Sequence, residues 1–340
     1  MGTVDSRNDE RETVSAGSSS LIAHRSSFVP AVLLLVTLLV LTLAIAVSFG
    51  AVAIDWNDPT ARDILLRLRL PRVLLAAAVG ATLAVAGVTF QTLLRNPLAD
   101  PFTLGVSGGA AAGAAIATAL RWARFPGVVP LTAFAGAIGA TAAVFLLARR
   151  RDHTDPVRLL ISGLVLNAFF SAVILISFSL SRQADLTAAL RWMMGTLWGA
   201  TWTQVALVTV PLVFALGLLT FVANDLRLLA FGEEDAKARG VDVERVKLLG
   251  FGIASLITGA AVAVSGIIGF VGLLVPHLIR LVWRRDFRFL LPLCALGGAT
   301  LVVAADALSR LLVVTAELPV GAFTAILGVP FFLSLLRRAR

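Results

Sequence analysis

The sequence predicts an all-α membrane protein that crosses the bilayer many times. Of its 340 residues, 58% are hydrophobic and only 14% are charged, a balance that soluble domains seldom show. Apolar runs of about 20 residues recur along the chain, and a helix of that length crosses about 30 Å of hydrocarbon. Most charged residues gather in short stretches between these runs. Together these observations predict a bundle of transmembrane helices.

We count ten apolar runs that are long enough to span a membrane. The run from 248 to 283 is too long for one helix, and Gly266 and Gly269 favour a break just after Ser265. With that break included, the predicted spans are 29–53, 72–94, 102–120, 128–148, 159–181, 203–223, 246–265, 267–283, 290–308 and 319–336.

The residues before the first span differ from the rest of the chain. Residues 1–27 are rich in Ser, Gly and mixed charges, which predicts a disordered tail. The segment does not match a signal peptide, because it carries several acidic residues and the next apolar run is too long. The sequence therefore predicts two regions: a tail over 1–27 and one transmembrane domain over 28–340.

The basic residues predict how the chain is oriented. With ten spans both termini share a side, and that side carries 20 of the 29 Lys and Arg residues, against 9 on the other. The positive-inside rule places the richer side in the cytoplasm, for a protein of the cytoplasmic membrane. The net charge of +9 thus indicates contact with anionic lipid headgroups and not with nucleic acid.

A faint internal repeat links the two halves of the chain. Residues 80–87 and 259–266 agree at five of eight positions, and they lie five predicted spans apart, so they cross in opposite directions. Inverted repeats are common in transporters. A chance match between two spans rich in Gly, Ala and Val is the alternative.

Residues 224–247 form the longest polar stretch after the tail, between two apolar runs. Within it, Gly232 to Arg239 predicts one short helix with acidic residues in its first turn and basic residues in its last. Gly240 follows as a C-terminal stop. We interpret this stretch as a water-exposed helix that transmits motion from a soluble partner; a solvated loop helix is the alternative.

No catalytic, nucleotide or metal site is predicted. The chain lacks the G-x-x-x-x-G-K-[ST] pattern, and its only lysines are Lys237 and Lys247. Three histidines and one cysteine have no ligand spacing, so we expect neither a metal site nor a cofactor. Ser265, His277 and Asp306 are not spaced as a catalytic set.

Asp306 is the one acid predicted inside a span, and charge there is costly. Arg310 lies one turn away, so a local ion pair is the simplest interpretation. A proton-driven transporter, for which several buried acids would be expected, is kept as an alternative.

Several motifs, taken in order, resemble the iron-chelate uptake permeases, which are transmembrane subunits of type II ABC importers and include haem and cobalamin permeases. The resemblance runs from about residue 29 to the C-terminus. It is carried by RLPR (69–72), GATLAVAGVTFQTLLRNPLADPFTLGVSGGAAAG (80–113), WMMG (192–195), LAFGEEDAKARGV (229–241), GIIGFVGLLVPHLIR (266–280), LLPLCALGGATLVVAADALSR (290–310) and ELPVGAFTAILGVPFF (317–332).

The resemblance implies ten transmembrane helices, a homodimer with a central pathway, two cytoplasmic ATP-binding subunits and an extracytoplasmic substrate-binding protein. The chain would be a transport subunit and not an enzyme, since a partner hydrolyses ATP. The implied cargo is a ferric siderophore or haem, with cobalamin as the alternative.

The resemblance also implies roles for particular residues. The fifth and tenth spans would line the pathway. The segment 229–241 would couple the permease to the ATPase, through Gly232, Glu233, Ala236, Arg239 and Gly240. Docking of the binding protein would use exposed arginines at the outer rim, namely Arg69, Arg72 and Arg310.

Overall fold

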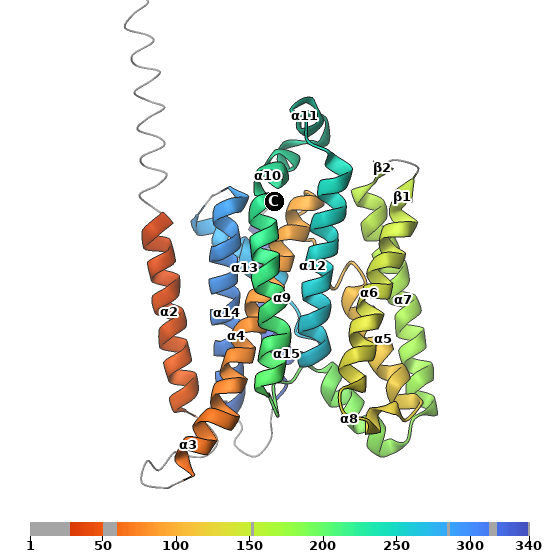
Figure 1. The fold of residues 1–340 in the computed structure, drawn as a ribbon, viewed down its shortest axis with the longest axis vertical. Helices are drawn as coiled ribbons and strands as arrows, with labels where there is room; N and C mark the ends of the chain where they lie inside the picture. Colours follow the sequence, from red (N-terminus) through yellow and green to blue (C-terminus); the bar gives the residue numbers. More distant parts are fainter. Residues whose placement is uncertain (1–27, 50–59, 151–152, 284–285, 313–317, 339–340) are drawn as a thin grey trace, which may run out of the picture.

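The computed structural model describes residues 28–49, 60–150, 153–283, 286–312 and 318–338 (Figure 1). Each predicted span corresponds to a helix within these ranges. The ten helices are α2 (Phe28–Ser48), α4 (Leu70–Leu93), α5 (Val106–Ala119), α6 (Val128–Ala148), α7 (Pro156–Leu180), α9 (Trp202–Phe221), α12 (Val243–Ser265), α13 (Val271–Val282), α14 (Phe287–Leu312) and α15 (Val320–Arg338).

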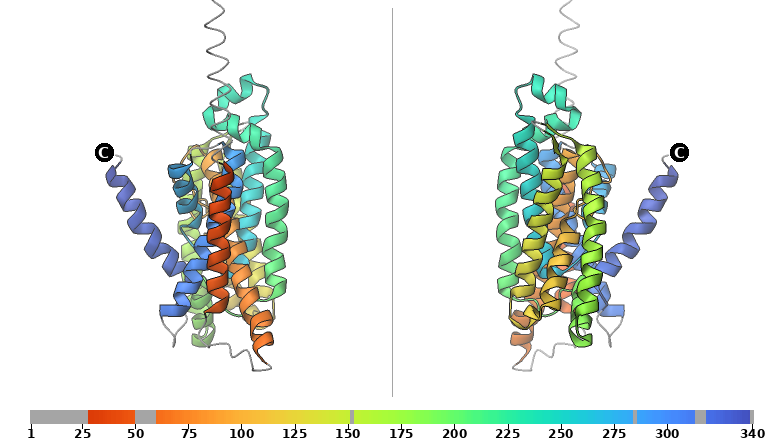
Figure 2. Two further views of the ribbon diagram at one scale, coloured as in Figure 1. Left: turned by 90° about the vertical axis from the view of Figure 1, so that its left-hand side faces the viewer. Right: turned by 90° about the vertical axis from the view of Figure 1, so that its right-hand side faces the viewer.

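Seven helical segments in the described ranges are long and apolar enough to cross a membrane, and three shorter ones correspond to α5, α13 and α15. The helices run side by side, apart from α15, which leaves the bundle at an angle (Figures 1 and 2). The all-α fold expected from the sequence is therefore confirmed, and the one strand pair that the described ranges contain has only two residues per strand.

Short elements mark the two ends of the bundle. One end, which we call the α11 end, carries α10 (Ala223–Phe231), α11 (Glu233–Ala238) and the strand pair β1 (Arg149–Arg150) and β2 (His153–Thr154). The opposite end, the α8 end, carries α3 (Ala61–Asp63), the π-helical turn η1 (Ile64–Arg69), η2 (Trp122–Arg124) and α8 (Gln183–Met193). The start of α2 and the finish of α15 both lie toward the α11 end, as an even number of crossings requires (Figure 2).

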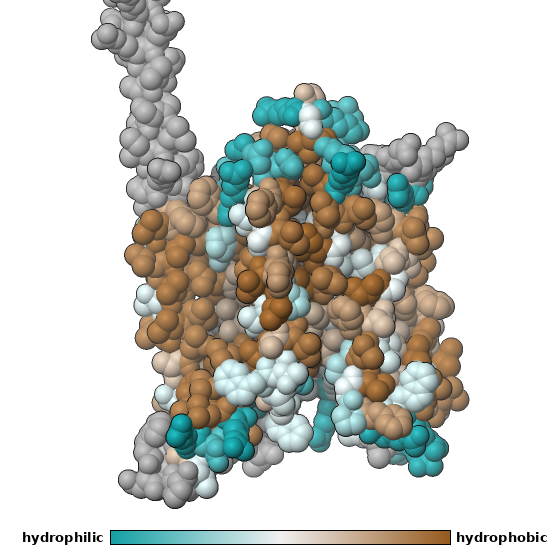
Figure 3. Space-filling view, viewed as in Figure 1, coloured by the Kyte–Doolittle hydropathy of each residue, from teal (hydrophilic) through white to brown (hydrophobic). Residues whose placement is uncertain are grey.

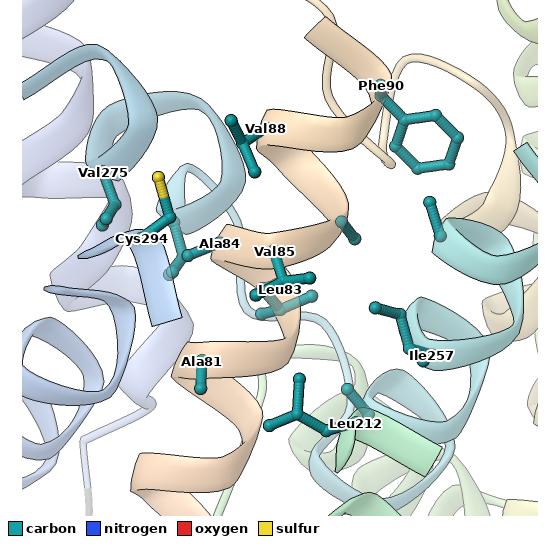
Figure 4. Packing of buried hydrophobic residues seen from close by; sticks show 14 of the residues in the cluster. Ala81, Leu83, Ala84, Val85, Val88, Phe90, Leu212, Ile257, Val275 and Cys294 are labelled. Carbon is teal, nitrogen blue, oxygen red and sulfur yellow. The ribbon is translucent and has the colours of Figure 1, made fainter. Parts of the chain in front are cut away.

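Helix α4 forms the centre of the bundle, and every residue from Val79 to Leu93 is buried. Figure 4 shows its apolar side chains between Cys294 of α14 on one side and Ile257 of α12 on the other. Small residues allow this burial because they let neighbouring backbones approach closely. A Cβ atom built on Gly80 would lie 2.1 Å from the carbonyl oxygen of Gly298 in α14.

Glycine allows an equally close backbone contact at two further helix crossings. A Cβ atom on Gly87 would lie 2.0 Å from the carbonyl oxygen of Gly272 in α13. On Gly109 of α5 it would lie 2.4 Å from the carbonyl oxygen of Gly136 in α6. These backbone contacts leave no room for a side chain, so the crossing points of the bundle are fixed by glycine.

The predicted break after Ser265 is confirmed. Helix α12 ends at Ser265, Gly266 has a φ of 68°, and α13 begins at Val271. The carbonyl of Ser265 accepts a hydrogen bond from the backbone N–H of Thr196 (2.8 Å). A neighbouring loop thereby satisfies a carbonyl that the helix end leaves without an intrahelical donor.

The faint repeat is only partly reflected in the structure. Helices α4 and α12 run in opposite directions, as predicted (Figure 1). However, Gly87 lies inside α4 against Gly272, whereas Gly266, its counterpart, ends α12. The matched residues therefore occupy different structural positions.

We predict that Gly80→Ala destabilises the protein by about 1–3 kcal/mol, because the added methyl group forces α4 and α14 apart. Gly217→Ala is the matched control, since Gly217 lies inside α9 with open space around its Cβ position. That change should be neutral or stabilise by about 0.5–1 kcal/mol. Thermal unfolding of the purified variants measures both effects, and equal melting temperatures would contradict the proposed packing.

Candidate functional site

The helix predicted from Gly232 to Arg239 is present as α11. Gly232 precedes it with a φ of 156° and Gly240 follows it with a φ of 82°, values that favour glycine. The N–H of Gly240 donates to the carbonyl of Lys237 (2.9 Å), and that of Val241 donates to the carbonyl of Ala236 (3.1 Å). This pair of bonds is a Schellman motif, so α11 has a defined end as well as a defined start.

The faces of α11 differ from the expectation in one respect. Ala236 was expected to contact a partner, but it is fully buried within this chain. Its methyl group packs in the apolar cluster beneath α11, so it anchors the helix and offers no contact surface. The exposed residues between Gly232 and Val241 are Glu234, Asp235, Lys237, Ala238, Arg239 and Gly240.

A buried lysine ties α11 to the rest of the bundle. The Lys247 side chain is only 4% exposed. Its Nζ donates to Glu233 Oε2 of α11 (2.8 Å), to Glu244 Oε1 of α12 (3.2 Å) and to the carbonyl of Thr154 in β2 (2.7 Å). An ammonium group has three N–H donors, so all three are used. We call these four residues the Lys247 cluster.

Glu244 completes this cluster by bonding Thr154 twice. Its Oε2 accepts from the Thr154 hydroxyl (2.7 Å), and its Oε1 accepts from the Thr154 backbone N–H (3.2 Å). The cluster therefore joins α11, the start of α12 and the connection between α6 and α7. Removing one partner of such a buried ion pair typically costs about 3–5 kcal/mol, because a charge is left without compensation.

Sequence analysis did not find the Lys247 cluster. The only local signal was the pair Glu244 and Lys247, which are three residues apart on one helix face. Thr154 is 93 residues from Lys247, so no local pattern connects the two. Glu233, predicted to face a partner, is instead engaged within the chain.

At the α8 end, Asp306 lies between two arginines. Its Oδ1 accepts from Arg72 Nε (3.0 Å), and Arg310 Nε lies 3.1 Å from its Oδ2. The predicted pairing of Asp306 with Arg310 is thus confirmed. The contact with Arg72 was missed, because it joins α4 to α14 across 234 residues of sequence.

Two of the three predicted docking arginines cap the end of α2. Arg69 Nη1 donates to the carbonyls of Val47 (2.7 Å) and Ser48 (2.9 Å). Arg310 donates from Nη2 to Ala46 (3.0 Å) and from Nη1 to Phe49 (3.2 Å). These carbonyls belong to the last turn of α2 or follow it, where no intrahelical donor is available.

Arg69, Arg72 and Arg310 are thus engaged within this chain, and their role in docking the binding protein stays a prediction. Their burial is explained by the acceptors they satisfy, because a buried guanidinium needs such partners. The exposed arginines of the same stretch are Arg62 and Arg67. Arg67 is 79% exposed and lies 3.2 Å from Asp63.

Asp100 is a second buried acid, which the sequence analysis did not single out. It follows α4 in the loop before α5, and its Oδ1 has no hydrogen-bond partner among the described residues. Burial raises the pKa of this carboxyl to about 7, against a smaller lowering by the backbone of Phe102. Across the described part of the chain, no three acids, histidines or cysteines gather as metal ligands.

Comparison with known proteins identifies relatives over nearly the whole chain. The model of the FecCD transport family matches residues 29–338. The cobalamin import system permease protein BtuC of Halobacterium salinarum is 43% identical over 295 residues, covering 86% of this chain and 79% of that protein. The hemin transport system permease protein HmuU of Yersinia pestis is 42% identical over 321 residues, covering 90% of this chain and 95% of that protein.

A solved structure confirms the fold. It is described as an inward-facing conformation of a metal-chelate type ABC transporter, and it superposes with a TM-score of 0.83 at 31% identity. The match covers 90% of this chain and 98% of the other.

Proposed function

Because the chain belongs to the FecCD transport family, we propose that two copies of it form the membrane pathway of an ATP-driven importer for an iron complex. At the level of the family it is the permease subunit of a type II ABC importer, a transport subunit and not an enzyme. Family membership implies ATP-binding subunits and a substrate-binding protein as partners.

The proposed cargo is haem or a ferric siderophore. The Yersinia relative, named a hemin permease, supports this cargo, since it aligns over 95% of its own length. Cobalamin is an equally compatible second candidate, favoured by the relative from Halobacterium. All three are bulky metal chelates.

The proposed membrane is the cytoplasmic membrane, with the α11 end in the cytoplasm. The excess of Lys and Arg on the predicted inner side supports this orientation. The placement of α10, α11 and the strands β1 and β2 at a single end of the bundle supports it too. In the proposed dimer, α7 and α15 line the pathway, as the resemblance implies.

The proposed coupling route starts at the exposed face of α11. An ATP-binding subunit would push on Glu234, Lys237 and Arg239, while buried Ala236 holds the helix to the body. The Lys247 cluster would then convey the movement to α12 and to the start of α7. The observation that carries this proposal is the burial of one ammonium group among oxygens from three separate elements.

The proton-driven alternative loses its main support. Asp306 was its candidate proton carrier, but both of its oxygens face arginines that compensate its charge. The two ion pairs with Arg72 and Arg310 therefore explain why a carboxylate is buried at this position.

Uptake by the complete transporter tests the function. In liposomes holding this chain, the ATP-binding subunits and the binding protein, we expect ATP-dependent accumulation of haem or a ferric siderophore. Cobalamin is assayed beside them, and its accumulation alone would favour the second candidate. Accumulation by this chain without the ATP-binding subunits, driven by a pH gradient, would contradict the importer assignment.

The coupling route predicts a defect in Lys247→Met. The assembled complex should still hydrolyse ATP but move about tenfold fewer cargo molecules per ATP, since typical coupling energies allow 5- to 150-fold effects. Arg245→Met is the matched control, because Arg245 lies on the same helix, is 83% exposed and is outside the Lys247 cluster.

Lys247→Met also leaves the two partly buried carboxylates of Glu233 and Glu244 without their shared cation. The double variant Lys247→Met/Glu233→Gln removes one of these charges. Its ATP hydrolysis should remain uncoupled from transport if the bonds that Lys247 makes to α11 and β2 carry the coupling. Complex assembly is checked by size-exclusion chromatography. An unchanged transport-to-hydrolysis ratio in both variants would rule out the proposed route.

Docking of the binding protein is proposed to use the exposed arginines of the α8 end. Arg67→Glu should slow association with the binding protein, most strongly at low salt, because exposed charges act mainly on association rates. Arg69→Glu should instead lower the melting temperature, since it removes the cap of α2. Slower association in Arg69→Glu at an unchanged melting temperature would restore the original assignment.

A further inference from the structure

A pocket of about 350 Å³ opens at the α11 end of the bundle. It lies between the end of α4, α10, the end of α13 and the start of α14. We call it the arginine pocket, because three arginines are among its lining residues. These are Arg95, Arg227 and Arg280, and the acid in the lining is Asp286.

The arginines of the pocket are only partly compensated. Arg227 Nη1 lies 3.4 Å from Asp286 Oδ2, and its Nη2 donates to Asn224 Oδ1 (3.1 Å). Its Nε is buried and has no hydrogen-bond partner within the described ranges. An unmatched donor on a charged group is costly, so the compensation of Arg227 is incomplete.

Arg280 has a neutral acceptor in place of a carboxylate. Its Nη1 donates to Gln91 Oε1 (2.5 Å), and Gln91 Nε2 donates in turn to the carbonyl of Gly272 (3.1 Å). That second bond fixes the amide so that its oxygen faces Arg280. No ion pair joins Arg280 to any described carboxylate, so the pocket holds three positive charges against one negative.

The other wall of the pocket is apolar and continues into exposed hydrophobic surface. Ala230, Phe231, Phe287 and Leu290 line it. Phe231 is 74% exposed, and Phe221, at the end of α9, is 88% exposed. Figure 3 shows the apolar surface of the bundle reaching the polar residues of the α11 end. A ligand that fits both walls has an anionic head and an apolar body.

We propose that the arginine pocket binds the headgroup of an anionic phospholipid. The phosphate would sit against Arg227 and Arg280, and the acyl chains would follow the exposed apolar surface beside Phe231. Basic pockets between membrane helices at the cytoplasmic boundary are suited to such headgroups. A carboxylate from a protein partner would satisfy the arginines but leave the adjoining apolar surface unexplained.

Native mass spectrometry of the full-length protein tests the proposal, with phosphatidylglycerol and phosphatidylcholine of identical acyl chains as probes. We expect about a tenfold preference for phosphatidylglycerol, given about 1 kcal/mol per basic residue near the headgroup. Arg280→Gln should lower the preference to about twofold, because it removes one of these basic residues. Arg245→Gln is the control, because Arg245 is 83% exposed at the same end and outside the pocket.

Gln91→Glu is a second variant that keeps every arginine. It places a carboxylate beside Arg280, so it should expel the lipid phosphate, and its melting temperature measures the effect of losing the Gln91 bond to the Gly272 carbonyl. A preference that is undiminished in both Arg280→Gln and Gln91→Glu would overturn the proposal.

Two competition experiments separate the other sources of negative charge. Inorganic phosphate in excess should leave bound phosphatidylglycerol in place, and its displacement would assign the pocket to free phosphate. Addition of the ATP-binding subunits should also leave the lipid bound. Its release at that step would assign the pocket to a carboxylate of the partner and overturn the lipid proposal.

Discussion

The burial of the Lys247 ammonium group is the constraint on which the α11 end depends. A charge that is 4% exposed must be surrounded by oxygen atoms, and here they come from α11, α12 and β2, of which β2 is 93 residues away in sequence. The elements cannot separate without leaving a buried ion uncompensated. As a result, α11 is attached to α12 and β2, although it is a short helix with a glycine at each end.

The α8 end uses the same physical principle with the opposite sign. There a carboxylate, Asp306, is buried between Arg72 of α4 and Arg310 of α14. Between the two ends, the helices meet through glycine contacts such as Gly80 against Gly298, which need no polar groups. Charge compensation thus holds helices together at the two ends, and close backbone contact holds them together in the middle.

The transmembrane helices were predictable from the sequence because long apolar runs mark them. The break at Gly266 and helix α11 were predictable too, because both depend on residues that are neighbours in sequence. Helix α8 was missed, since it is amphipathic and short and lies between two predicted spans. The backbone carbonyls that Arg69 and Lys247 bind were missed for another reason: they lie 21, 22 and 93 residues away. The burial of Ala236 likewise depends on the surface beneath α11, which no local pattern records.

Helix α10 links the two proposals of function and lipid binding. It carries Arg227 into the arginine pocket and leads through Gly232 directly into α11, which the Lys247 cluster holds. A force on α11 that shifts α10 also changes the position of Arg227 relative to Asp286 and to a bound phosphate. In that case the proposed lipid would bind the two transport states with different affinities, and linkage would make the effect reciprocal. An anionic headgroup in this pocket would therefore shift the equilibrium between transport states that nucleotide binding also shifts. It would do so through its contact with α10.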